Sequence, residues 1–292
     1  MKLFVFLSLF LPLFFSCRKL VQNEFPDFSP VPVVNGILVA DSLIKIHVSL
    51  AEKLDTNKLG WIDNARVDLY TNGQYTETFS YREKGFYSGT TIVEPGKTYS
   101  CEVEIPGFVK VKCTDSIPLT TTLTEIGQID IAGKDEEGAS YSSIVFTFND
   151  NQEQTNYYEV KIILERVYSD LINNLDPVLL NEGLPVSVFS DELIQNGTNT
   201  MTINYYNSNY PDESNGGYSR LLPVVLELRS ISYDYYKYTK DLYIYETGRH
   251  PTIVGGVVTP YQLYSNVEDG LGIFAGYSRV ISDTIFPETP KN

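Results

Sequence analysis

The stretch Ile44-Lys45-Ile46-His47-Val48-Ser49-Leu50 alternates apolar and polar side chains with a period of two residues. Successive side chains of a β-strand point to opposite faces, so this pattern predicts a strand that buries its four aliphatic residues on one face. Residues 33–39, Val-Val-Asn-Gly-Ile-Leu-Val, form an apolar run just before it. The folded part of the chain therefore begins with two β-strands.

Turn signals follow these strands at short intervals. Asn72-Gly73 comes directly after a strand pattern at residues 65–70, and this pair favours the tight turn of a β-hairpin. Pro95-Gly96 and Pro106-Gly107 mark two further turns. About seven short strands over residues 33–118 predict a β-sandwich, and their succession resembles the immunoglobulin-like or transthyretin-like modules of bacterial surface proteins.

Two cysteines flank the predicted hairpin tip at Pro106-Gly107. Cys101 and Cys113 fall on the apolar face of their strands, opposite each other. An exported protein can keep a disulfide at such a place, whereas two buried free thiols would also suit a core. Both alternatives stay open at this point.

The second half of the chain has a more varied pattern. Residues 116–124 suggest a join between domains, and strand patterns at 143–148 and 157–167 resemble the opening of a fibronectin-type sandwich. Residues 171–184 are less regular and can hold a short helix, while residues 233–245 carry aromatic side chains at helical spacing. The sequence thus predicts an all-β protein of two sandwiches, at 33–118 and 119–292, with a short helical insertion in the second.

The N-terminus has the features of an export signal. Lys2 precedes an apolar run of thirteen residues, which at ~1.5 Å per helical residue is too short for a hydrocarbon core of ~30 Å. Leu13-Phe14-Phe15-Ser16-Cys17 resembles the lipobox of bacterial lipoproteins, although Phe14 replaces the usual small or aliphatic residue. We expect a signal peptide at 1–16, lipidation (palmitate) at Cys17 and a tether at 17–32. The alternative is an ordinary secretory signal with an incidental cysteine.

The formal net charge of −15 limits the choice of partners. An acidic chain is repelled by nucleic-acid phosphates and by anionic lipid surfaces, so we expect no nucleic-acid partner. Membrane attachment would come from acyl chains on Cys17, which contribute ~0.8 kcal/mol per buried methylene group.

Little in the sequence points to catalysis. His47 and His250 have no local serine, cysteine or aspartate frame, and the pairs Glu268-Asp269 and Asp191-Glu192 would point to opposite faces of a strand. Residues 135–138 and 149–151 lack the spacing of a calcium loop. We therefore expect no enzymatic activity, no cofactor and no metal.

Two groups of residues are candidates for a ligand or partner surface. The first consists of tyrosines in or beside a polar loop, because exposed tyrosines are favoured in recognition surfaces: Tyr205, Tyr206, Tyr210 and Tyr218. The second lies in the glycine-rich block 264–277 and comprises Asn266, Glu268 and Asp269. The structural alternative is ordinary strand tyrosines for the first group and a tight turn before a final strand for the second.

Several blocks together resemble one family. They are Ser190-Asp191-Glu192-Leu193 with Asn196-Gly197, residues 226–238, and Tyr264-Ser265-Asn266-Val267-Glu268-Asp269-Gly270-Leu271-Gly272-Ile273-Phe274-Ala275-Gly276-Tyr277. With the lipobox they resemble the domain of unknown function 4249 (DUF4249) of Bacteroidota lipoproteins. The resemblance implies an outer-membrane location, on a face it leaves open, and a TonB-dependent outer-membrane receptor (a SusC-like β-barrel) as partner.

Three functions follow as hypotheses. The first is a non-enzymatic accessory subunit of a TonB-dependent transport system, which captures a solute or gates the pore. The second is a structural or adhesive surface lipoprotein. The third, with the least support, is a hydrolase whose site is assembled only in space.

Overall fold

The computed structural model describes residues 29–51, 60–172, 176–194, 197–207, 221–248 and 261–288. The predicted signal peptide, Cys17, Tyr210, Tyr218 and His250 lie outside these ranges. The described part consists of three β-sheets and two helices, which confirms the all-β prediction.

The largest sheet has nine strands and contains the strand that the alternation at 44–50 predicts. Its order is β12 (Val167–Ser169), β11 (Tyr157–Leu164), β15 (Val224–Ile231), β17 (Leu271–Ile281), β1 (Val31–Val39), β2 (Leu43–Ala51), β6 (Phe86–Ile92) and β5 (Ser80–Tyr81), with β13 (Val188–Ser190) also paired to β11.

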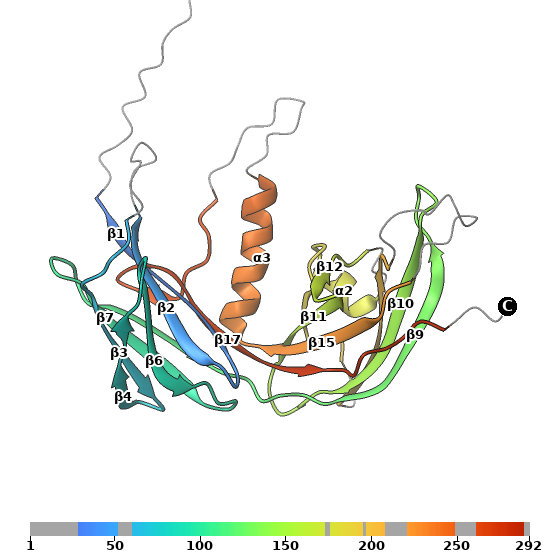
Figure 1. The fold of residues 1–292 in the computed structure, drawn as a ribbon, viewed down its shortest axis with the longest axis horizontal. Coiled ribbons are helices and arrows are strands. Elements are labelled where there is room, and N and C mark those ends of the chain that lie inside the picture. The colour runs from blue at the N-terminus through green and yellow to red at the C-terminus, as the bar shows by residue number, and fades with distance from the viewer. Residues whose placement is uncertain are drawn as a thin grey trace, which may run out of the picture.

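Two smaller sheets cover one face of the large sheet at its two ends (Figure 1). The five-stranded sheet has the order β16 (Val267–Glu268), β8 (Val111–Ser116), β7 (Thr98–Glu104), β3 (Arg66–Thr71), β4 (Gln74–Thr78). The three-stranded sheet has the order β14 (Thr198–Tyr205), β10 (Ser140–Asn149), β9 (Leu123–Lys134). Each encloses its own apolar core, so the molecule has an N-terminal and a C-terminal lobe.

The N-terminal lobe follows its turn chemistry closely. Asn72 and Gly73 both have positive φ, at 49° and 78°, as a two-residue hairpin turn between β3 and β4 requires. Cys101 and Cys113 are direct partners across β7 and β8 in the buried core, and both are free thiols. The structure therefore has the free-thiol alternative and contains no disulfide at this pair.

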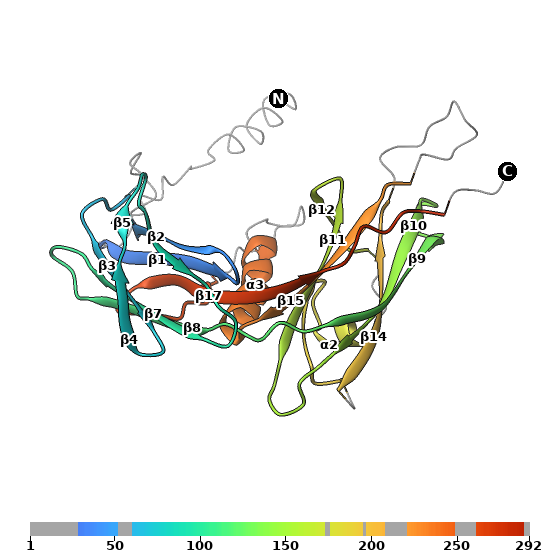
Figure 2. The same ribbon diagram turned by 60° about the horizontal axis from the view of Figure 1, so that its bottom comes forward.

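β17 belongs to both lobes. It runs parallel to β1 over seven residue pairs, from Val33–Leu271 to Val39–Tyr277, and antiparallel to β15 over five pairs. A division of the chain at residues 118 and 119 assigns β17 to the second domain, yet the strand completes the sheet of the first. The two sandwiches therefore share one continuous sheet (Figure 2).

The close approach of β1 and β17 depends on one glycine. Gly272 has a φ of +120°, and a Cβ atom added there would lie 2.1 Å from the backbone oxygen of Val34. No other residue type fits this conformation without a shift of the backbone. The glycine-rich block at 264–277 thus has the structural role of a turn and a strand.

Two helices complete the fold. The short α2 (Pro177–Asn181) lies within the range where a short helix was predicted, and the sixteen-residue α3 (Tyr233–Gly248) confirms the helix predicted from aromatic spacing. α3 stands on the concave side of the large sheet, between the two lobes (Figure 1).

Candidate functional site

The concave face of the large sheet carries charged side chains where the opposite face is apolar. On β11 and β15 the residues Val160, Ile162, Leu226 and Leu228 are fully buried in the core of the C-terminal lobe. Alternation along the strands places Glu159, Lys161, Glu227 and Arg229 on the other face. The registry pairs Glu159 with Arg229 and Arg229 with Arg279, so these charges form a row across three strands.

Arg229 is the centre of this row. Its Nη1 donates to Glu159 Oε2 at 2.8 Å and its Nε to Glu227 Oε1 at 2.6 Å, and both carboxylates are almost wholly buried. The guanidinium lies over the ring of Tyr277, 4.5 Å from its centroid, and Nη2 donates to the hydroxyl of Tyr168 at 2.9 Å. A guanidinium makes separate contacts of this kind to two carboxylates and an aromatic face more readily than an ammonium group does.

The electrostatics keep this guanidinium charged. Burial lowers the pKa of Arg229, but the nearby charge of Glu159, together with Tyr277 and Glu227, raises it more, so the net pKa lies above its ordinary value. Lys161 adds a second cation at 2.8 Å from Glu159. Because every buried charge here already has a partner within the fold, this cluster positions strands and aromatic side chains and does not offer a vacant ligand.

α3 is fixed to the concave face at its first turns. Ser232 caps the helix by accepting from the backbone N–H of Tyr235 at 3.2 Å. Asp234 accepts from the hydroxyl of Tyr264 at 2.5 Å and from Asn266 Nδ2 at 2.9 Å. The return segment after the helix is thus tied to the helix start.

A second anchor comes from α2. Glu182 lies directly after α2 and accepts from Lys240 Nζ at 2.7 Å and from the hydroxyl of Tyr236. Burial raises the pKa of Glu182, but hydrogen bonds from Lys240, Tyr236 and Ser190 lower it below its ordinary value. The carboxylate therefore stays ionised and holds the helix, whose residues 246–248 are exposed.

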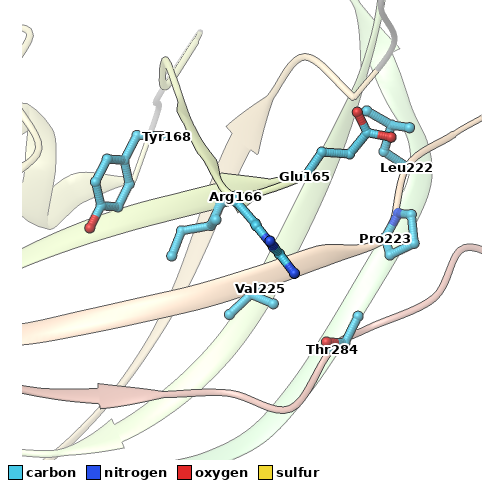
Figure 3. Close-up of a pocket in the computed structure, with 8 residues that line it drawn as sticks. Glu165, Arg166, Tyr168, Leu222, Pro223, Val225 and Thr284 are labelled. Atoms are coloured by element: carbon cyan, nitrogen blue, oxygen red, sulfur yellow. The ribbon is translucent and has the colours of Figure 1, made fainter.

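A pocket of about 780 Å³ opens beside the charged row. It lies between the β11–β12 hairpin and the start of β15, and its lining includes Ile163, Glu165, Arg166, Tyr168, Leu222, Pro223, Val225 and Thr284. Figure 3 shows the guanidinium of Arg166 pointing toward Val225 and Thr284, whereas the carboxylate of Glu165 points toward Leu222. Tyr168 joins the pocket to the row, since its hydroxyl also donates to Glu227 Oε2 at 3.2 Å.

The predicted tyrosine surface is wrong in one member. Tyr205 ends β14 with its side chain fully buried in the core of the C-terminal lobe, because its position in the alternation of β14 faces the large sheet. Tyr206 is 39 % exposed and donates to Asp135 at the tip of the β9–β10 hairpin. Tyr210 and Tyr218 lie outside the described residues.

The second predicted group does not form one surface either. Asn266 donates to the backbone oxygen of Phe274 at 2.7 Å and accepts from its N–H at 2.9 Å, so its amide is used within the fold. Glu268 lies in β16, which pairs with β8, and Asp269 has a positive φ of 57° in the turn that follows. Both acidic side chains are exposed on the N-terminal lobe.

The sequence prediction missed the residues of the concave face. Glu227 and Arg229 sit in a strand pattern, Leu226 to Ile231, in which charges alternate with apolar residues, and such a strand is expected to face water. Glu165 and Arg166 lie inside the strand predicted at 157–167, whereas the structure has a two-residue turn there between β11 and β12. The pair lacks the Asn-Gly composition that indicates such a turn.

Neither a histidine site nor a metal site is found in the described ranges. His47 contacts the ring of Phe86 and the backbone oxygen of Lys84, and neither partner is a carboxylate. Among described residues, no group of three or more histidine, cysteine, aspartate or glutamate side chains is arranged to hold a metal ion. Of the two helices described, neither is long and apolar enough to cross a membrane.

A family model described as a domain of unknown function, DUF4249, matches residues 19–281, which is most of the chain. No curated protein matches.

Proposed function

The chain belongs to the DUF4249 family, and from this membership, its N-terminal sequence and its concave face we propose that it is a lipid-anchored, non-enzymatic accessory protein of a TonB-dependent transport system in the outer membrane. In this role it captures a solute or helps to gate the pore of a β-barrel receptor. The acyl chains on Cys17 attach it to the membrane, and residues 17–32 are the tether.

The observation that carries the proposal is the position of α3. The helix stands between two lobes on the concave side of one continuous sheet, with its base fixed by Asp234 and by Glu182 (Figure 1). Farther along, Ile244 is 36 % exposed, and the helix carries six tyrosines in all. Tyrosine gives large contact area at a low cost in conformational entropy, so a rigid helix of this composition suits protein recognition.

The test is purification of the protein with its neighbours from its own outer membrane in mild detergent. We expect a TonB-dependent receptor to accompany the wild-type chain. Ile244→Asp places a charge on the exposed part of α3 and should reduce the recovered receptor at least tenfold. Ile131→Asp is the matched control, because Ile131 is a 55 % exposed isoleucine on β9, away from α3, and should leave recovery unchanged.

The same preparation tests the anchor. Mass spectrometry should find a mature N-terminus at Cys17 that bears acyl chains, and Cys17→Ala should move the protein into the soluble fraction. Recovery of no receptor in any preparation would refute the transport role. Recovery of an extracellular partner in its place would favour the adhesive alternative.

A further inference from the structure

We propose that the pocket between the β11–β12 hairpin and β15 binds a zwitterionic solute with an apolar body, of the class of an aliphatic amino acid or a short peptide. Arg166 would hold the carboxylate, Glu165 would hold the ammonium group, and the apolar lining would hold the side chains. The proposal deepens the solute-capture role proposed above, and it rests on that role only for its biological purpose.

The charged groups of Glu165 and Arg166 are not used within the described fold. Glu165 and Arg166 form no ion pair and no side-chain hydrogen bond with any residue the structure describes, although they are neighbours in the chain. Their side chains diverge across the pocket (Figure 3). In contrast, Arg229 and Lys161 on the same face are fully engaged with Glu159 and Glu227. Arg279 also reaches Glu227, at 3.6 Å, so Arg166 is the pocket-lining guanidinium that has no ion pair among the described residues.

Glu165 and Arg166 also have an unusual backbone conformation. Glu165 and Arg166 have φ values of 47° and 72°, so both occupy the left-handed region that a two-residue hairpin turn requires. Asparagine and glycine adopt this conformation readily, whereas other residues incur a cost of roughly 1 kcal/mol or more each. The turn therefore carries two long charged side chains at consecutive positions beside the pocket, where an Asn-Gly pair would lower the strain but remove both charges.

The composition and size of the pocket suit a small molecule. Ile163, Leu222, Pro223 and Val225 give an apolar floor, and Thr284 places a hydroxyl group near the guanidinium. A volume of about 780 Å³ lies within the ~300–1,000 Å³ typical of small-molecule sites. A planar guanidinium binds a carboxylate through two parallel hydrogen bonds, and a carboxylate at the other end of the pocket favours a cation. Together these groups favour a ligand with an apolar body, a carboxylate at one end and an ammonium group at the other.

The charged row also holds one wall of the pocket in place. Tyr168 lines the pocket with its ring, while its hydroxyl is held by Arg229 and Glu227. The buried charged row therefore fixes one wall of the site. It acts as a positioning element and does not contact the ligand.

The experiment uses the full-length protein in detergent, with binding measured by isothermal titration calorimetry. The ligands are leucine, leucyl-leucine and leucyl-leucyl-leucine, each also in an N-acetylated form and in a C-terminally amidated form. We expect at least one of the unmodified ligands to bind. Amidation and acetylation should each weaken its binding tenfold or more, since a charge-assisted hydrogen bond contributes ~1.5–3 kcal/mol.

Two variants assign the groups. Arg166→Gln should weaken the unmodified ligand tenfold or more and should not weaken the amidated ligand further. Glu165→Gln should behave in the same way toward the acetylated ligand. Lys84→Gln is the matched control, because Lys84 is also a positive-φ residue that follows a glutamate in a hairpin turn, but it lies on the N-terminal lobe away from the pocket. This variant should bind as the wild type does.

Three results would overturn the proposal. They are the absence of binding by all three unmodified ligands, binding that Arg166→Gln leaves unchanged, and losses from Arg166→Gln and amidation that add independently. Because the assay needs no receptor, a negative result here leaves the transport role intact. Conversely, failure to recover a receptor does not alter the binding result.

Discussion

The two ends of the nine-stranded sheet use the same architecture for different purposes. In the N-terminal lobe, side chains alternate between an apolar core and a solvated face that carries ion pairs such as Lys110–Glu104, in which both partners are exposed. In the C-terminal lobe, the face opposite the core buries Glu159, Glu227 and Arg229. Exposed pairs contribute ~0–1 kcal/mol, whereas buried pairs incur a large desolvation penalty. The difference is consistent with our proposal that the N-terminal lobe is a scaffold and that ligand selectivity belongs to the C-terminal face.

The largest effect should come from the strand that joins the two lobes. Gly272→Ala places a Cβ 2.1 Å from the oxygen of Val34 and forces β1 and β17 apart. We expect a loss of about 4 kcal/mol or more, enough to prevent folding of a marginally stable chain. Soluble yield and urea unfolding measure it. Gly127→Ala is the control, because nothing lies within 4 Å of its added Cβ; an equal loss there would contradict the account.

The next effect separates the two faces. Arg229→Leu removes the buried cation that Glu159 and Glu227 share and leaves each carboxylate only a more exposed partner, Lys161 or Arg279. We expect a destabilisation of ~3–5 kcal/mol. Arg82→Leu on the exposed surface of the N-terminal lobe should change stability by less than ~0.5 kcal/mol. Urea denaturation measures both. In the Arg229→Leu background, Glu159→Gln with Glu227→Gln should restore more than half of the loss, and no restoration would indicate a cause other than unpaired charge.

The same variant tests whether the lobes unfold as one unit. Trp61 is the only tryptophan, and it lies in the N-terminal lobe beside β2, where it bridges to Ser49. Because β17 is shared, we expect Arg229→Leu in the C-terminal lobe to shift the transition seen by Trp61 fluorescence as much as that seen by far-UV circular dichroism. A fluorescence midpoint that stays at its wild-type value would mean that the lobes fold independently.

A smaller, pH-dependent effect belongs to the junction below α3. Asp115 accepts from the backbone N–H of Gly276 at 2.8 Å. The net pKa of Asp115 is raised to about 7, because burial and the charge of Asp234 raise it more than hydrogen bonds from Ser232, Ser116 and Gly276 lower it. An unfolded aspartate has a pKa near ~3.9, so the folded state retains its proton longer.

The difference between the folded and unfolded pKa of Asp115 sets the direction in which stability changes with pH. The stabilising contribution of the Asp115 proton is full below pH ~4 and is lost as the pH rises to about 7, where the folded state ionises. Relative to Asp115→Asn, the wild type should therefore lose ~3 kcal/mol of unfolding free energy between pH 5 and pH 8. Urea denaturation at both pH values measures it. Parallel pH profiles of the two proteins would contradict the prediction.

The smallest effect concerns the two thiols. Cys101 and Cys113 are opposite each other and free, so dithiothreitol should not shift the thermal midpoint of the N-terminal lobe measured by Trp61 fluorescence. Thiol reagents should label them only after unfolding, because both are buried. A disulfide closing this hairpin would instead give a reductant-sensitive midpoint, with a loss of the order of 2–4 kcal/mol.

Local patterns foretold much of the fold. The alternation at Ile44 to Leu50 and the turn at Asn72-Gly73 act within a few residues, and both are found as β2 and the β3–β4 hairpin. The spacing of aromatic residues likewise located α3, because helix periodicity is visible in sixteen residues. These signals require no knowledge of which strands pair at long range.

The remainder depends on pairings that no local pattern contains. Strand periodicity cannot tell that β17 lies parallel to β1, and this pairing is what joins the two predicted domains. It also cannot tell that the polar face of β15 is covered by Tyr168, Tyr235 and Tyr277, which buries Arg229. Tyr205 was misplaced for a similar reason, since its position beside a polar loop concealed its place in the core.

The parallel pair β1–β17 also governs when the N-terminal lobe can be completed. The hydrogen bond from Ile273 N–H to Asn35 joins residues 238 positions apart. β1 can therefore pair with β17 only when almost all of the described chain is present. Until then one edge of β1 has no strand to pair with, and such edges attract other chains. The unpaired edge of β1 therefore persists until β17 is available, and a chaperone that shields β1 in this interval should improve the yield of native molecules.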